Sequence, residues 1–258
     1  MRKNKAYLFG PFFGELSWEY YRFAPYAIHL KKENPDIKLI VMTRPQRFDL
    51  YGQYADVLVP LKIENEHVYQ QQAFKLLGFD LAVHKQICDM FRITYKKKYI
   101  LEDVFVPDVS SLRYNLKWQF PRGKMDYDFS PRKSCLNIIK KFYRKKENVL
   151  VDFDYEFKNQ KYNIIQTRHF QRMTSMLTSS DTSTSYIGCL IEMIKHSKFV
   201  ISHLTSDVAK LALLLKVPLI YPNREMTIDN VNLLNPLNTP IIDCESVEEG
   251  VRIYENNI

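Results

Sequence analysis

The chain has 258 residues, which is enough for one large domain or two small ones. Hydrophobic residues make up 46% of it and charged residues 26%, as in globular proteins, and no apolar run approaches the ~20 residues that a membrane-spanning helix needs. The formal net charge of +8 favours an anionic substrate or a polyanionic partner, although the coding bias of an AT-rich genome would also enrich lysine.

The sequence argues against several common kinds of site. Only 7 glycines occur, so the chain has no Gly-rich phosphate-binding loop. The four cysteines (Cys88, Cys135, Cys189 and Cys244) are far apart and the six histidines are scattered, so we expect reduced thiols and no metal site. The basic residues at 1–5 precede an apolar run too short for a signal peptide, which predicts a cytoplasmic protein.

The first sixty residues predict a βαβ unit with a third strand. Apolar strands are expected at 7–9, 37–42 and 56–59, and an amphipathic helix over 18–32, with Pro25 inside it. Strands that alternate with helices favour a parallel sheet with right-handed crossovers.

The middle of the chain is less regular. Helices are expected at 69–77 and 81–91, and the segment 113–146 interleaves cations with aromatic side chains. Such a segment suits a nucleic-acid surface, with charges for phosphates and rings for bases. A solvated linker followed by a basic helix at 136–146 explains the same pattern, and both interpretations stay open.

The last third returns to alternating strands and helices. Its expected strands are 162–166, 199–201, 217–222 and 240–243. Its expected helices are 186–196, 208–215 and a C-terminal one that Ser246 caps and that runs to Tyr254, and 175–185 is expected to be a loop.

A polar turn, residues 202–207, joins the strand at 199–201 to the helix at 208–215. The backbone N–H groups at the start of such a helix point outward and suit an anion, at the strand end where α/β proteins bind ligands. An ordinary Ser or Asp N-cap is the alternative interpretation.

Two sets of residues carry a resemblance to a known class of enzymes: 14–19, Pro25 and 34–40 at the front of the chain, and 206–212 and 217–218 at the back. With these residues the chain resembles GT-B glycosyltransferases, most closely the heptosyltransferase-like branch, which transfers sugars from nucleotide donors. The resemblance implies an α/β fold with two Rossmann-like halves, whose parallel sheets are flanked by helices.

The implied division has three parts. They are an acceptor-side domain at 1–110, an irregular basic connecting segment at 111–160 and a nucleotide-sugar donor domain at 161–258.

The resemblance also implies a catalytic carboxylate. Counted back from Pro25, Glu19 lies where the family has it, so we expect Glu19 to be the general base, with Glu15 in reserve. A capping carboxylate at the helix start is the alternative role for either residue.

The leaving diphosphate requires cations or helix N–H groups. Arg168, at the end of a predicted strand, is the best cation for it, with Lys210 behind. The expected donor-binding residues are Arg168, His203, Thr205, Ser206, Asp207 and Lys210 and, by family analogy alone, Glu225 and Asp229 on the ribose.

A second polar cluster follows the strand at 37–42. Arg44 and Arg47 are expected to hold an acceptor phosphate or a donor oxygen, and Asp49 and Tyr51 to bond sugar hydroxyls. A plain polar loop is the alternative.

The leading hypothesis is therefore a metal-independent, nucleotide-sugar-dependent hexosyl- or pentosyltransferase with no further cofactor. Its acceptor is a polyanion such as modified, phage-type DNA, or a surface saccharide. The alternative is a non-catalytic nucleotide- or nucleic-acid-binding protein on a degenerate GT-B-like fold. The sequence leaves the oligomeric state open.

Overall fold

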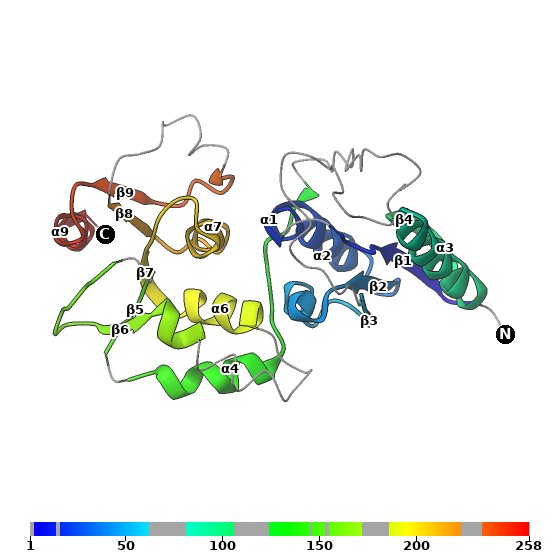
Figure 1. The fold of residues 1–258 in the computed structure, drawn as a ribbon, viewed down its shortest axis with the longest axis horizontal. Helices are drawn as coiled ribbons and strands as arrows, with labels where there is room; N and C mark the ends of the chain where they lie inside the picture. Colours follow the sequence, from blue (N-terminus) through cyan, green and yellow to red (C-terminus); the bar gives the residue numbers. More distant parts are fainter. Residues whose placement is uncertain are drawn as a thin grey trace. The chain divides into compact units, whose positions relative to one another are not determined.

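The computed structural model describes residues 3–13, 16–61, 81–105, 124–144, 146–152, 155–171, 186–222 and 234–257. The chain divides into two compact units, Met1–Ser130 and Pro131–Ile258, and each contains one parallel sheet flanked by helices (Figure 1).

The sheet of the first unit has the order β3-β2-β1-β4, with all pairs parallel. Its strands are β1 (Lys5–Phe9), β2 (Lys38–Thr43), β3 (Val57–Pro60) and β4 (Ile100–Phe105). Apolar residues in β1 and apolar, β-branched residues in β2 favour burial of both faces, as a parallel sheet requires.

Two helices cover opposite faces of this sheet. In β1, Leu8 packs in a core cluster with Phe91 of α3 (Leu81–Lys98), whereas the ring of Phe9 lies 5.6 Å from that of Phe23. Successive side chains of a strand point to opposite faces. The helical segment that contains Phe23 therefore covers the other face.

That segment is continuous from α1 (Leu16–Trp18) through a π-helical stretch (Glu19–Phe23) to α2 (Ala24–Glu33). Pro25 has no N–H to donate to the carbonyl of Tyr21, and that carbonyl accepts a hydrogen bond from the Tyr127 hydroxyl at 3.4 Å instead. Since Pro25 lies in the first turn of α2, it is tolerated there, and the expected helix is confirmed.

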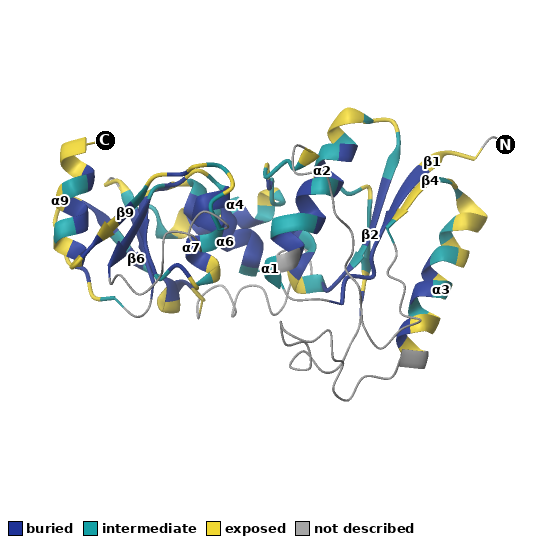
Figure 2. Cartoon of the chain, turned by 90° about the horizontal axis from the view of Figure 1, so that it is seen from above, coloured by how far each residue is buried: buried dark blue, intermediate teal, exposed yellow. Residues whose placement is uncertain are grey.

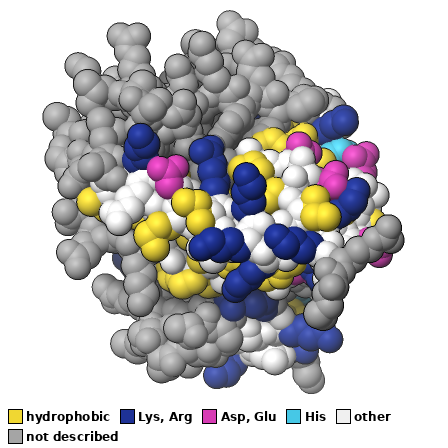
Figure 3. Space-filling view, turned by 90° about the vertical axis from the view of Figure 1, so that its right-hand side faces the viewer, with side chains coloured by type: hydrophobic (Ala, Val, Ile, Leu, Met, Phe, Trp, Pro, Cys, Tyr) yellow, Lys and Arg dark blue, Asp and Glu magenta, His cyan; other side chains and the backbone are white. Residues whose placement is uncertain are grey.

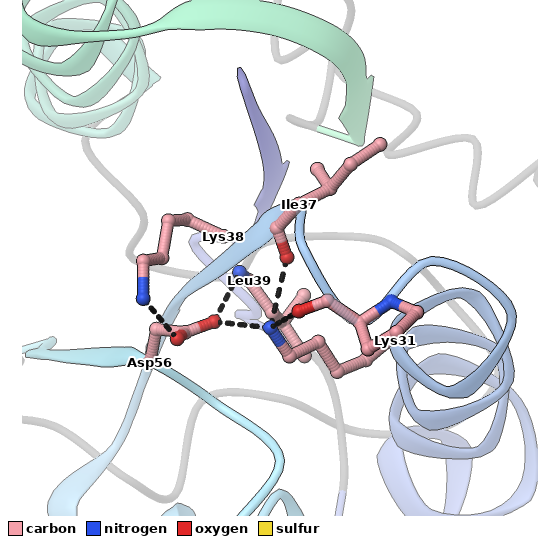
Figure 4. Close-up of polar contacts among 6 residues, drawn as sticks. Lys31, Ile37, Lys38, Leu39 and Asp56 are labelled. Carbon is pink, nitrogen blue, oxygen red and sulfur yellow. Dashed lines mark hydrogen bonds and ion pairs between the residues drawn. The ribbon is translucent and has the colours of Figure 1, made fainter. Parts of the chain in front are cut away.

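A carboxylate joins three elements at the amino edge of the first sheet (Figure 4). The Asp56 carboxylate accepts hydrogen bonds from the Leu39 N–H at 2.9 Å and from the Lys31 and Lys38 ammonium groups at 2.8 Å. Lys31 also donates to the Ile37 carbonyl at 2.9 Å. Burial acts to raise the pKa of Asp56, but the bonds from Lys31 and Lys38 outweigh it, so the pKa lies below its usual value.

The sheet of the second unit has the order β6-β5-β7-β8-β9, again all parallel. Its strands are β5 (Asn148–Val151), β6 (Asn163–Gln166), β7 (Ser197–Ile201), β8 (Leu219–Pro222) and β9 (Ile241–Cys244). The helices around it are α4 (Lys133–Ile139), α6 (Tyr186–Lys195), α7 (Asp207–Leu214) and α9 (Val247–Asn257). In Figure 2 the central strands of both sheets are buried, whereas β4 and the outer sides of α3 and α9 carry exposed residues.

Helix α9 packs closely on one face of the second sheet. Val251 and Tyr254 join the core cluster that contains Val149 and Phe199. A Cβ atom on Gly250 would lie 2.4 Å from Ile220 Cγ2 and 2.7 Å from Cys244 Sγ. The close approach of helix and sheet therefore requires a glycine at this position.

The predicted fold class is confirmed: two α/β halves with parallel sheets. Two strands, β4 and β5, were not predicted, and α3 extends to Lys98 beyond the expected end at 91. The basic helix of the alternative interpretation, 136–146, is present with different bounds. Helix α4 begins at Lys133 and ends at Ile139, and a short 3-10 helix (Lys140–Phe142) follows before the chain extends to enter β5.

The unit boundary also differs from the expected connecting segment at 111–160. Residues 124–130 belong to the first unit, where the Asp126 N–H donates to the Pro25 carbonyl at 3.1 Å, and residues 131–160 belong to the second, where they supply β5. The expected helix at 69–77, the loop at 175–185 and the part of the basic segment at 113–123 lie outside the described residues.

Candidate functional site

Polar side chains gather at the carboxyl edge of the second sheet, where three neighbouring strands end. Asp152 follows β5, Thr167 follows β6 and Ser202 follows β7. The Asp152 carboxylate accepts hydrogen bonds from the Ser202 hydroxyl at 2.5 Å and from the Thr167 hydroxyl at 3.3 Å, and Asp152 is only 2% exposed. We call Asp152, Thr167 and Ser202 the edge cluster.

The position of the edge cluster is significant because of the strand order. Starting from β5, the chain places β6 on one side and then β7 on the other, so the order of the strands reverses between β5 and β7. The crevice outside such a reversal is where open parallel sheets bind ligands. The bond between Asp152 and Ser202 spans it.

An aromatic side chain and an imidazole lie beside the edge cluster. The Tyr155 hydroxyl donates to the Pro222 carbonyl at 3.0 Å and also lies 3.0 Å from His203 Nδ1. The hydroxyl has one proton, so a hydroxyl that donates to the carbonyl accepts from a protonated His203 Nδ1. The two contacts hold Tyr155 between the His203 ring and the end of β8.

Helix α7 begins at the same edge. Its N-cap is Ser206, whose hydroxyl accepts from the Val208 N–H at 3.1 Å, so the N-cap interpretation of this residue is confirmed. In the first turn, Asp207 forms an ion pair with Lys210 at 3.7 Å. The pair reduces the repulsion that Asp207 would exert on an anion at the helix start.

The remaining expected donor residues fall into two groups. Arg168 directly follows Thr167 and is exposed, and Thr205 is exposed beside the helix start. Glu225 and Asp229 lie outside the described residues. The structure therefore brings Arg168, His203 and the start of α7 to one edge of one sheet, and the binding roles of these residues stay predictions.

Tyr186, at the start of α6, was not predicted to be a site residue from the sequence. Burial, together with the charges of Asp152 and Asp207, raises the pKa of its hydroxyl to about 12. The hydroxyl is thus a proton donor at neutral pH. Asp152 was also missed, although an acidic residue directly after the apolar run Val149–Val151 is a signal that could have revealed it.

In the first unit, the corresponding edge of the sheet holds a buried carboxylate. Glu19 is 0% exposed. Its Oε1 atom accepts from the Thr43 hydroxyl at 2.6 Å and the Tyr51 hydroxyl at 2.8 Å, and its Oε2 accepts from Arg47 Nη1 at 2.9 Å. We call these four residues the Glu19 cluster. Burial and the neighbouring Glu19 carboxylate raise the pKa of Tyr51 well above its usual value.

The Glu19 cluster joins elements that are distant in sequence. Thr43 ends β2, Arg47 lies in a 3-10 helix (Pro45–Leu50) and Tyr51 follows that helix. The predicted neighbourhood of Glu19, Arg47 and Tyr51 is thus present, but the four expected acceptor residues Arg44, Arg47, Asp49 and Tyr51 are all buried. Their acceptor role and the role of Glu19 as a base stay predictions, and Glu15 lies outside the described residues.

The described residues contain no group of three or more His, Cys, Asp or Glu side chains placed to hold a metal ion. Among them there is also no helix long and apolar enough to cross a membrane.

Comparisons with known proteins give structural matches only. No protein-family model matches the chain, and a search of curated proteins finds no match. E. coli heptosyltransferase WaaC, solved with ADP, matches over 100% of both chains with a TM-score of 0.51 and 12% identity. E. coli ADP-heptose LPS heptosyltransferase II matches over 93% of this chain and 90% of its own, at 9% identity and a TM-score of 0.45. A family 9 glycosyl transferase from Veillonella parvula matches over 99% and 91%, at 10% identity and a TM-score of 0.43.

At these identities the likeness concerns the fold. The chain has the glycosyltransferase fold of the heptosyltransferase WaaC, as its resemblance to the GT-B class predicted.

Proposed function

We propose that the protein is a glycosyltransferase that binds a nucleotide sugar at the carboxyl edge of the second sheet. The observation that carries this proposal is the convergence of exposed Arg168, the edge cluster and the start of α7 at the strand-order reversal. The shared fold supports it, because the WaaC structure contains ADP. The expected cytoplasmic location is part of the proposal.

The residues suit the chemistry of a leaving diphosphate. The N–H groups of the first turn of α7 and the guanidinium of Arg168 would stabilise the negative charge that develops on it. The edge cluster would hold the strand ends in place beneath these groups, because its carboxylate is buried and bonded on both sides. We propose that transfer needs neither a metal ion nor a further cofactor.

For Glu19 we propose a positioning role. Its carboxylate is fully buried and accepts from three donors, so it fixes the loop after β2 in the described conformation. A general base has to reach the acceptor hydroxyl. The burial of Glu19 therefore favours positioning over proton transfer.

The sugar, hexose or pentose, and the acceptor, modified DNA or a surface saccharide, belong to the same proposal. A donor panel of UDP-, GDP-, ADP- and CMP-sugars, incubated with and without hydroxymethylated duplex DNA, distinguishes them by nucleotide release. Release that depends on DNA identifies the polyanionic acceptor. Release without DNA is hydrolysis of the donor by water, which shows donor turnover and leaves a surface saccharide as the proposed acceptor.

The donor site is tested by nucleoside diphosphates. We expect one of them to raise the unfolding temperature, because a ligand that binds the folded state stabilises it. Arg168→Ala should weaken that nucleotide's binding by about tenfold or more, since hydrogen bonds from a charged group contribute ~1.5–3 kcal/mol. Arg252→Ala, which removes an exposed arginine from α9, is the matched control. If no diphosphate binds and no donor is hydrolysed, the proposal is wrong.

A second candidate is a nucleotide-binding protein without turnover. The burial of Glu19 favours it, because a buried carboxylate is kept from an acceptor hydroxyl. Diphosphate binding that depends on Arg168, without release from any donor, would support this candidate over the enzyme.

A further inference from the structure

The large exposed hydrophobic side chains of the described residues are confined to two neighbouring elements, α3 and β4. They are Val83 (45% exposed), Met90 (59%), Ile93 (53%), Ile100 (50%) and Val104 (41%). Elsewhere in the part of the chain that the structure describes, large hydrophobic side chains are less exposed than these five. Contiguous exposed apolar side chains on a folded domain mark an interaction site.

Helix α3 has two apolar sides. One side carries Cys88 and Phe91, which pack on the first sheet with Leu8. On the other, Val83, Met90 and Ile93 are spaced by seven and three residues, so they form one stripe along the helix. We call this stripe, together with the cations of α3 (Lys85, Arg92, Lys96, Lys97 and Lys98), the α3 face.

The α3 face is strongly basic. Helix α3 contains five cations (Lys85, Arg92, Lys96, Lys97 and Lys98) and one carboxylate, Asp89. The neighbouring β4 adds two exposed carboxylates, Glu102 and Asp103, and Glu102 is paired with Lys5 at 2.7 Å, so cations outnumber carboxylates in this region. The start of the chain adds to the same region, since the Lys3 ammonium donates to the Lys96 carbonyl at 3.4 Å. Figure 3 shows this side of the molecule, with Lys and Arg side chains interspersed among hydrophobic ones.

Charge and apolar character together identify the partner. A nucleic acid would use the cations, but its phosphate backbone offers nothing to an aliphatic stripe. A second copy of the chain would use the stripe, but it would place five cations against five. An anionic lipid surface uses both, because headgroup phosphates attract the lysines while aliphatic side chains enter the acyl boundary.

We propose that the α3 face docks the protein on the surface of an anionic membrane. The inference concerns the first unit alone and does not rest on the proposed transferase activity, because docking needs no donor. If both proposals hold, the enzyme works at a membrane surface, and a surface saccharide is the acceptor that this location favours.

The test is co-sedimentation of the full chain with phosphatidylcholine vesicles, with and without phosphatidylglycerol. We expect binding only to the vesicles with phosphatidylglycerol, weakened by added salt. Lys96→Gln/Lys97→Gln should weaken binding about 25-fold, at about fivefold for each cation near the surface. Lys140→Gln/Lys141→Gln makes the same charge change on exposed lysines of the second unit and should leave binding unchanged.

The apolar stripe is tested separately by Met90→Ser/Ile93→Ser, against Met90→Leu/Ile93→Val as a control that keeps it apolar. We expect the serine variant to lose vesicle binding and the control to retain it, both with wild-type unfolding curves. If the serine variant does not fold, the lysine pair decides the test.

Three results would overturn the proposal. The first is no binding to anionic vesicles, and the second is equal loss of binding in both lysine pairs. The third is full vesicle binding by a folded serine variant, because the apolar stripe would then contribute nothing. Equally strong binding to duplex DNA would in that case identify a general polyanion as the partner. A wild-type dimer that Met90→Ser/Ile93→Ser dissociates, without vesicle binding, would identify a second copy as the occupant.

Discussion

Replacing Glu19 by glutamine tests the buried cluster of the first unit. The variant keeps the shape of the side chain but removes its charge. The amide oxygen can still accept from Thr43 and Tyr51, whereas the amide NH₂ would face the Arg47 guanidinium, donor against donor. Arg47 cannot lose its proton, so its buried charge would lose the carboxylate that it faces.

The expected cost follows from the loss of that ion pair. Removing one partner of a buried ion pair typically costs ~3–5 kcal/mol, so Glu19→Gln should lower the free energy of unfolding of the first unit by about that amount. Replacing both partners, in Glu19→Gln/Arg47→Met, should cost less than Glu19→Gln alone, because the buried guanidinium no longer faces an amide NH₂.

The assay is native-state hydrogen exchange of the backbone amides of β1 and β2, which reports on the first unit without the second. A loss below ~1 kcal/mol in Glu19→Gln, or a double variant less stable than the single one, would refute the reasoning. Nucleotide release measured where the variant is still folded separates the two roles of Glu19. Abolished release with normal stability would restore it as the general base.

Three further predictions concern other sites. Asp56→Asn should destabilise the first unit by ~1–3 kcal/mol at neutral pH, through loss of its charged hydrogen bonds. Folding lowers the pKa of Asp56 below its usual value, so the difference in free energy of unfolding between Asp56→Asn and wild type should shrink as the pH falls below about 4. Urea unfolding measures this difference, and a difference that stays constant across that pH range would contradict the prediction. Gly250→Ala should cost ~1–3 kcal/mol by overpacking against Ile220 and Cys244, measured by thermal unfolding against the exposed control Asn256→Ala on the same helix. EDTA should leave nucleotide release unchanged, and a loss restored by a divalent cation would show that the reaction requires a metal ion.

The elements predicted best from the sequence are those whose local signals agree. The run from β7 through α7 to β8 combines a β-branched strand, an N-cap and a strong helix former, and each is where the sequence placed it. Strand β4 was missed because two of its six residues, Glu102 and Asp103, are acidic and a lysine run precedes it. Strand β5 has only four residues and follows a charged stretch, so its identity depends on pairing with β6 and β7.

The candidate sites show the same limit. The sequence placed Glu19 and Arg47 near one sheet edge, but their burial depends on contacts between residues that are 24 to 32 positions apart. Asp152 became visible as a site residue only when Thr167 and Ser202 were brought to it by strand order. Periodicity predicts elements, whereas the distances between their ends are set by tertiary packing.

The strand order of the first sheet also determines how that unit can be made. Strand β1 leaves the ribosome first, yet it lies inside the sheet between β2 and β4, with Lys5 in register with Ile100. Until residue 105 has been synthesised, the apolar strand that ends at Phe9 keeps one hydrogen-bonding edge uncovered. Uncovered edges of this kind template aggregation, and long-range parallel pairing is slow. Between completion of β3 and arrival of β4, the nascent first unit therefore exposes an edge at which it can pair with another chain.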